Sequence, residues 1–242
     1  MERKLDVGAS LSEVFSIYGS QAGVLLPVAF CIFLVVGIVD GLLAGSFVLL
    51  PLTLAVSVIA ATLYQGMVVG LVRDVQDGRR DSTAGELLRA ATPVIAPLIG
   101  AGLLSGIGIA VGLFLLIVPG LILLTIWAVI APVIVIERSG VIDAFGRSRE
   151  LVRGNGWQVF GVVISAFLIA LIVGFIFGAI GAGIVHGAAG RIIFNIASST
   201  LTAPITALAA AVIYYRLRAI EGAGAPAVGD AGAAPPPGPD AV

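Results

Sequence analysis

The sequence predicts an all-α integral membrane protein with six transmembrane helices in three hairpins, each preceded by a short interfacial amphipathic helix. Three observations lead to this fold class. Hydrophobic residues make up 59% of the 242-residue chain and charged residues only 11%, whereas about a quarter of the residues in a soluble domain are charged. Long apolar stretches alternate with short polar ones. Finally, all but one of the 13 Lys and Arg residues fall in alternate polar stretches, as in cytoplasmic segments of membrane proteins.

The positions of these cations also predict the topology. They cluster in the N-terminal segment, in two loops and after the last apolar stretch, and only Arg191 falls on the opposite side. We therefore expect a multi-pass protein of the cell inner (plasma) membrane with both termini in the cytoplasm. The clustered cations are Arg3, Lys4, Arg73, Arg79, Arg80, Arg89, Arg138, Arg147, Arg149, Arg153, Arg216 and Arg218.

Six apolar stretches are candidates for spans, since a helix needs roughly 20 apolar residues to cross a bilayer core about 30 Å thick. The predicted spans are residues 23–43, 46–72, 93–118, 120–136, 157–185 and 192–215. Pro119–Gly120 is predicted as the turn between the third and fourth, because Pro disfavours a helical residue before it and Gly permits a tight turn. The fourth stretch is short, so a full span and a re-entrant or tilted segment both stay open.

A short amphipathic segment precedes each predicted hairpin. These segments are residues 9–20, 82–92 and 140–154. In the first two, Ser10 and Thr83 lie three residues before Glu13 and Glu86, the spacing of a capping box. Amphipathic helices of this kind suit the plane of the membrane interface. The recurrence has two explanations, a threefold internal repeat or unrelated capped helices at each re-entry into the bilayer. Residues 221–242, rich in Ala, Gly and Pro, are predicted as a disordered cytoplasmic tail.

The loop between the fourth and fifth spans carries the candidate binding residues Arg147, Arg149 and Arg153. Arg149 and Arg153 are four residues apart, so on a helix they are neighbouring like charges that gain from an external anion. Phospholipid phosphate is the anion at that depth, and each basic residue near an anionic leaflet contributes about 1 kcal/mol. The alternative is that these arginines serve only as a topology signal.

Three aromatic residues flank predicted spans at the interface. Trp157 begins the fifth, and Tyr214 and Tyr215 end the sixth, so all three are predicted as anchors at headgroup level.

Catalytic, metal and cofactor sites are not predicted. The chain has one His and one Cys, so no metal cluster or internal disulfide is expected. The net charge of −1 gives nucleic acid no electrostatic footprint. No ionisable residue falls at mid-depth, which disfavours an ion-coupled carrier. The amides Gln65 and Asn195 are expected to bond neighbouring helices.

The stretch from Val118 to Trp157 resembles a known family. Its pattern is Pro-Gly, an apolar span, Pro followed by valines, Glu137, then Arg147-Ser148 and Gly154-Asn155-Gly156-Trp157. It is similar to the bacterial membrane-domain family named after glycerophosphoryl diester phosphodiesterase. The resemblance implies a membrane module that in some members is joined to a soluble phosphodiesterase domain and in many others stands alone. This chain has no segment for such a domain, so no hydrolase activity is expected.

These observations predict a non-enzymatic multi-pass membrane protein of unassigned role. Its expected partners are membrane lipids, with a membrane or cytoplasmic protein as a further partner, and it serves as a lipid-interacting or partner-anchoring module. The alternative is a transporter or permease for lipid-like or small apolar molecules. A water-accessible cavity at mid-depth would favour the transporter, and a closed, dry bundle would oppose it. The sequence predicts no oligomeric state.

Overall fold

The computed structural model describes residues 4–43, 47–78, 85, 92–184 and 188–224. All regular structure in this part of the chain is helical, which confirms the all-α prediction. The α-helices are α1 (Val7–Leu42), α2 (Leu50–Gln76), α4 (Ile95–Leu115), α5 (Ile117–Ile126), α6 (Ile130–Glu137), α7 (Val141–Val152), α8 (Gly156–Ile184) and α9 (Ala188–Gly224), with 3₁₀ turns η1 (Phe47–Leu49) and η2 (Thr92–Val94). Six helical stretches among the described residues are long and apolar enough to cross a membrane, with α5 and α6 counted together.

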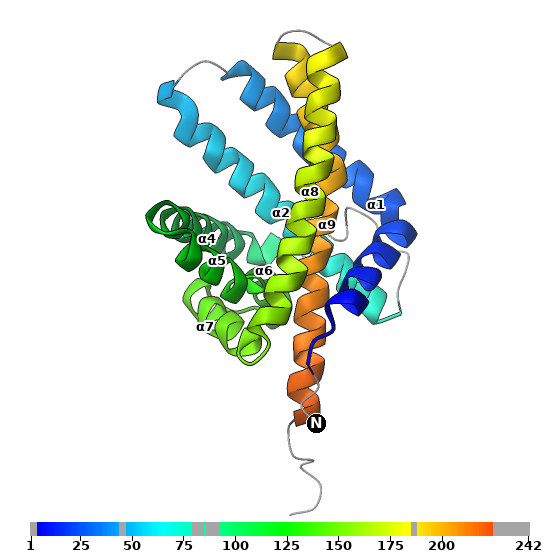
Figure 1. The fold of residues 1–242 in the computed structure, drawn as a ribbon, viewed down its shortest axis with the longest axis vertical. Helices are drawn as coiled ribbons and strands as arrows, with labels where there is room; N and C mark the ends of the chain where they lie inside the picture. The colour runs from blue at the N-terminus through cyan, green and yellow to red at the C-terminus, as the bar shows by residue number, and fades with distance from the viewer. Residues whose placement is uncertain (1–3, 44–46, 79–84, 86–91, 185–187, 225–242) are drawn as a thin grey trace, which may run out of the picture.

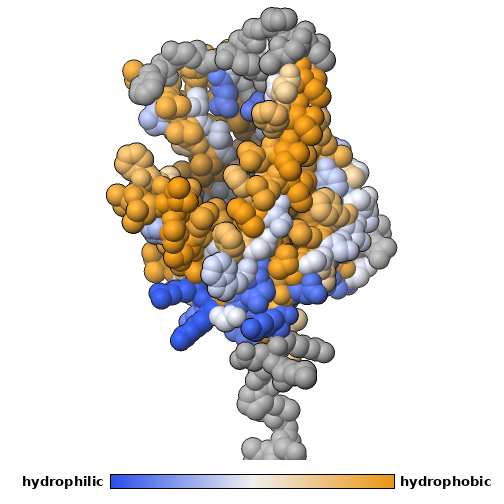
Figure 2. Space-filling view, viewed as in Figure 1, coloured by the Kyte–Doolittle hydropathy of each residue, from blue (hydrophilic) through white to orange (hydrophobic). Residues whose placement is uncertain are grey.

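Helix α9 is the axis of the bundle, and α1, α2 and α8 pack against it (Figure 1). The first described residues, α7 and the last turns of α9 lie at one end of the molecule, and the end of α1, the start of α2, the end of α8 and the start of α9 lie at the other. Figure 2 shows hydrophilic residues gathered at the first end and hydrophobic residues over most of the face above it. We call the end that carries α7 and the last turns of α9 the polar end.

The best-packed part of the bundle is the half nearer the polar end. Buried side chains are dense in the second half of α2, in α6 and in the second half of α9. Toward the far end, apolar side chains point outward; for example, Phe175 of α8 is 78% exposed. Exposed apolar side chains along helices of spanning length are what acyl chains cover in a membrane.

The segment predicted as the first interfacial helix is not a separate element. Helix α1 runs without a break from Val7 to Leu42. Asp6 is its N-cap, since the Asp6 carboxylate accepts a hydrogen bond from the Ala9 amide at 2.9 Å. The predicted capping box at Ser10 is therefore wrong, because the helix has already begun, and the Ser10 hydroxyl donates instead to the Asp6 carbonyl. The predicted helix 82–92 falls almost wholly outside the described residues, whereas α7 occupies the segment predicted at 140–154.

The turn between the third and fourth apolar stretches lies at Leu116, not at Pro119–Gly120. Leu116 is the one extended residue between α4 and α5, with φ −155° and ψ 132°. Pro119 lies in the first turn of α5, where the missing N–H costs no intrahelical bond. Gly120 is needed for close packing, since a Cβ there would lie 2.5 Å from the Leu113 backbone nitrogen.

The fourth predicted span is broken. Helix α5 ends at Ile126, and α6 begins at Ile130. Pro132 is one cause, because it has no N–H to donate to the carbonyl four residues earlier. At the C-terminus, α9 continues to Gly224, so the first residues of the predicted disordered tail are helical.

Candidate functional site

Helix α7 is held at the polar end by a turn on each side. Arg138, with φ 52°, and Gly154, with φ 87°, have left-handed backbone conformations before and after it. The buried side chains of α7 face the bundle: Ala144, Ser148, Leu151 and Val152. Charged side chains occupy much of the remaining surface of α7, as expected for a helix in the interfacial plane.

The buried face of α7 docks on the break between α5 and α6. The Ser148 hydroxyl donates to the Ile126 carbonyl at 2.7 Å, and Ser148 is fully buried. Next to this bond, the rings of Trp127 and Phe145 meet edge to face at a centroid distance of 4.8 Å. The Ile126 carbonyl, at the end of α5, thus finds a partner in α7, which avoids the cost of an unpaired buried acceptor.

A network of ionic hydrogen bonds ties α6, α7 and α9 together. Glu137 accepts from the Arg147 Nε at 3.2 Å, the Tyr214 hydroxyl at 2.9 Å and Arg218 at 3.0 Å. Arg147 also donates two hydrogen bonds to Glu221, at 2.8 and 2.6 Å. The hydrogen bond to Glu221 is the largest cause that raises the pKa of Arg147, against a lowering by burial. Arg147 is therefore a charged structural link between three helices.

The three candidate lipid-binding arginines thus differ in their surroundings. Arg147 is occupied by carboxylates within the protein, so the prediction of a lipid contact there requires correction. Arg149 and Arg153 are exposed, and neither side chain has a carboxylate partner within the part of the chain that the structure describes. Arg216 at the same end pairs with Glu13 at 2.7 Å. Arg149 and Arg153 are therefore left open to an external anion.

The predicted interface anchors also separate into two kinds. Trp157, at the start of α8, is 84% exposed. Tyr214 is only 1% exposed and bonds Glu137, so it contacts protein where a headgroup contact was expected. Tyr215 is half-buried, and its hydroxyl is buried without a hydrogen-bond partner. The sequence offered one signal for the missed role of Tyr214: Glu137, at the end of an apolar stretch, needs donors from another helix.

A polar cavity lies between α2, α4 and the α5–α6 break. Its volume is about 60 Å³, and its polar lining comes from Thr62, Gln65 and Ser105 beside Trp127. The hydroxyls of Thr62 and Ser105 donate to carbonyls of their own helices. The Gln65 amide has no hydrogen-bond partner among the described residues, contrary to the expected helix-helix bond; the same holds for Asn195. A cavity of this size and polarity accommodates water.

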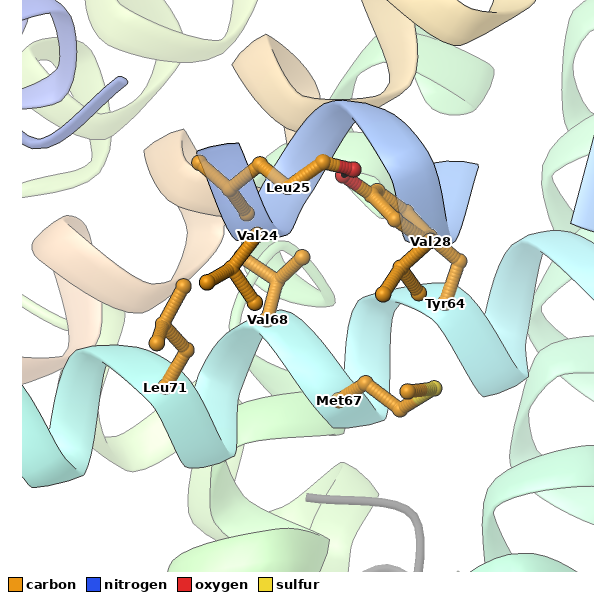
Figure 3. A pocket seen from close by; sticks show the side chains of 7 residues that line it. All are labelled: Val24, Leu25, Val28, Tyr64, Met67, Val68 and Leu71. Atoms are coloured by element: carbon orange, nitrogen blue, oxygen red, sulfur yellow. Dashed lines mark hydrogen bonds between the residues drawn. The ribbon is translucent and has the colours of Figure 1, made fainter. Parts of the chain in front are cut away.

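A second pocket, between α1 and α2, is a packing defect of about 10 Å³ (Figure 3). Its lining residues are Val24, Leu25, Val28, Tyr64, Met67, Val68 and Leu71. The Tyr64 hydroxyl donates to the Leu25 carbonyl at 3.2 Å, so its polar atom is already paired. The space holds one water at most, and its apolar walls offer a polar ligand no hydrogen-bonding group.

Residues 42–217 match the family described as "Domain of unknown function (DUF7847)". The chain belongs to this family. Over 100 residues it is 37% identical to a UPF0259 membrane protein of Pectobacterium carotovorum, a match that covers 41% of this chain and 39% of that relative. The match thus spans about two fifths of the relative's length. No solved structure matches the chain.

These matches overturn the resemblance to the glycerophosphoryl diester phosphodiesterase membrane domain, to which neither of them points. The residues behind that resemblance have local structural roles. Pro119 and Gly120 belong to α5, whereas Gly154 and Trp157 form the α7–α8 corner. These local roles explain the residues without the family resemblance. Among the described residues, no three His, Cys, Asp or Glu side chains are grouped to hold a metal.

Proposed function

We propose that this chain is a non-enzymatic multi-pass module of the inner membrane that binds anionic phospholipid at the α7–α8 corner. Arg149 and Arg153 bind the phosphate, and Trp157 lies at headgroup level. Both termini face the cytoplasm, as the cation pattern predicts. The observation that carries the proposal is the contrast among the arginines of the polar end. Arg147, Arg216 and Arg218 are bound by carboxylates of the protein. Arg149 and Arg153 are exposed and have no such partner in the described chain. The same is true of Arg138 before α7, but only Arg149 and Arg153 belong to the α7–α8 corner with Trp157.

The energetics follow from the position of these two charges. Each basic residue beside an anionic leaflet contributes about 1 kcal/mol, so the pair contributes roughly 2 kcal/mol, or about a 30-fold difference in affinity. The neighbouring Trp157 ring is exposed, and an indole is favourable at the membrane interface. An Arg guanidinium also presents several hydrogen-bond donors to one phosphate. An arginine that served only as a topology signal would not need to bind phosphate.

The experiment compares two double variants by native mass spectrometry from mild detergent. Arg149→Gln with Arg153→Gln should lose most of the phosphatidylglycerol that the wild type retains. Arg73→Gln with Arg216→Gln removes the same charge from two arginines that pair with carboxylates of the protein, Asp77 and Glu13. This control should retain the lipid. Equal lipid retention by the first variant and the wild type, or equal loss in both variants, contradicts the proposed site.

The polar cavity favours a second candidate function, a permease. The alternative predicted from the sequence concerned lipid-like or small apolar molecules. The amide and hydroxyls around the cavity suit a small uncharged polar molecule better. Proteoliposomes should then take up glycerol faster than protein-free liposomes, and Gln65→Leu should abolish the difference. Gln76→Leu, at an exposed position on the same helix, is the control. Equal uptake with and without protein contradicts this candidate.

A further inference from the structure

The α4–α5 hairpin has an apolar tip. No polar side chain occurs from Ile107 to Leu124. The side chains around the turn are 65% to 89% exposed: Phe114, Leu115, Leu116, Ile117 and Val118. The segments that join the other two helix pairs contain polar residues, such as Ser46 and His186. A turn that emerges into water has no need of so many apolar residues, and exposing them to water is unfavourable.

The contact with α7 sets an upper limit on the depth of this tip in the membrane. The Ile126 end of α5 is bonded to Ser148 of the interfacial helix α7. Helix α5 has 10 residues, so at 1.5 Å per residue Leu116 lies no more than about 15 Å from that end. This distance is half of a hydrocarbon core about 30 Å thick. Helix α8, which follows α7 directly and has 29 residues, reaches about 44 Å.

The position of the hairpin in Figure 1 agrees with this limit on its depth. The α4–α5 hairpin lies at mid-height beside α8, well short of the end where α1 meets α2 and α8 meets α9. The space-filling view shows an apolar surface on the hairpin and a hollow above it (Figure 2). The charged residues of the polar end lie below the hairpin.

Two backbone hydrogen bonds and a close helix-helix approach hold the turn together. The Leu116 amide donates to the Gly112 carbonyl at 3.1 Å, and the Gly120 amide donates to the Leu116 carbonyl at 3.5 Å. Gly112 and Gly120 let the two helices approach closely, since a Cβ at Gly112 would lie 3.0 Å from the Gly120 Cα. Both bonds pair backbone groups within the hairpin, which favours the hydrocarbon core because lipid offers no hydrogen-bond partners.

We propose that α4 and α5 form a re-entrant hairpin whose tip, residues 114–118, is embedded in the acyl chains near the middle of the bilayer. The hairpin enters from the side that carries α7 and returns to it. Helices α1, α2, α8 and α9 cross the membrane fully, so both termini still lie on one side. The partner of the exposed tip is lipid hydrocarbon.

Cysteine accessibility tests this depth in sealed membrane vesicles of both orientations. In a Cys31→Ser background, single cysteines replace Leu116, Gly146 of α7 and Leu43 at the end of α1. A membrane-impermeant maleimide should label position 146 from one side and position 43 from the other. Position 116 should react less than about a tenth as fast as either from both sides, because water and the reagent are absent from the hydrocarbon core.

A depth measurement completes the test. Bimane attached to the Leu116→Cys variant should be quenched more by lipids brominated near the end of the acyl chain than by lipids brominated near the carbonyl. Labelling of position 116 from the side of Leu43 would establish a full crossing, and labelling from the side of Gly146 a surface hairpin; each overturns the proposal. An unlabelled and unquenched position 116 would mean that protein covers the tip, which also overturns it. Ile117→Cys, at a second exposed position, guards against a local folding defect.

Discussion

Gly120→Ala should destabilise the protein, although alanine is the better helix former. The added methyl would lie 2.5 Å from the Leu113 backbone nitrogen, whereas ordinary contacts begin at 3.4 Å. The atom in the way belongs to the backbone, so α4 and α5 must move apart by about 0.9 Å, the difference between these two distances. Overpacking of this kind costs about 1–3 kcal/mol. The gain in helix propensity returns up to about 1 kcal/mol. The two effects together give a net loss of about 0–3 kcal/mol in the free energy of unfolding, with a central value near 1.5 kcal/mol.

Gly106→Ala is the matched control, since it makes the same change on α4 where a Cβ would meet nothing within 4 Å. It should leave the free energy of unfolding unchanged or raise it by up to about 1 kcal/mol. Titration of each purified variant with sodium dodecyl sulfate in mixed micelles, followed by circular dichroism, measures both values. If Gly120→Ala proved as stable as Gly106→Ala, the close approach of α4 and α5 at Gly120 would be refuted.

Three further predictions concern stability in the same assay. Glu137→Gln should lower the free energy of unfolding by about 1–3 kcal/mol because it weakens three charge-assisted hydrogen bonds. Its control, Glu150→Gln, changes a side chain that is 72% exposed and should cost less than about 0.5 kcal/mol. Equal losses would contradict the central role of Glu137. Ser148→Ala should cost about 1–3 kcal/mol because it leaves the buried Ile126 carbonyl unpaired. Ser20→Ala, at an exposed position, should cost much less. If Ser148→Ala were neutral, the bond from Ser148 to Ile126 would be excluded as a support of α7. Cys31→Ser should be neutral, since this cysteine is exposed and free; a marked loss would reveal an unrecognised packing role.

The helical membrane fold could be predicted from the sequence because length and hydropathy decide which segments suit a bilayer. The first and last residues of single helices were harder to predict, because they depend on individual contacts. The Asp6 carboxylate starts α1 before the apparent capping box at Ser10. Pro119 and Gly120 looked like a turn, but Pro119 lies in the first turn of α5 and Gly120 permits close packing. In both places the sequence motif was consistent with two structures. A local cap selected one of them at Asp6, and the packing of α5 against α4 selected one at Gly120.

The candidate site shows the same limit. The sequence placed the arginines of α7 at the membrane interface, but it did not distinguish Arg147 from Arg149. That distinction depends on Glu221, which is 74 residues away in the chain and reaches Arg147 only because α9 passes beside α7. Tyr214 likewise bonds Glu137 across 77 positions. Pairings of this range follow from the packing of helices, which one sequence does not specify.

The most direct test of the central claim is an electron cryo-microscopy map of the protein in nanodiscs that contain phosphatidylglycerol. Our account predicts density for a lipid phosphate within hydrogen-bonding distance of the Arg149 and Arg153 guanidinium groups, with the Trp157 ring at headgroup level. A map in which these arginines contact only water or protein, with α7 away from the headgroups, would contradict it.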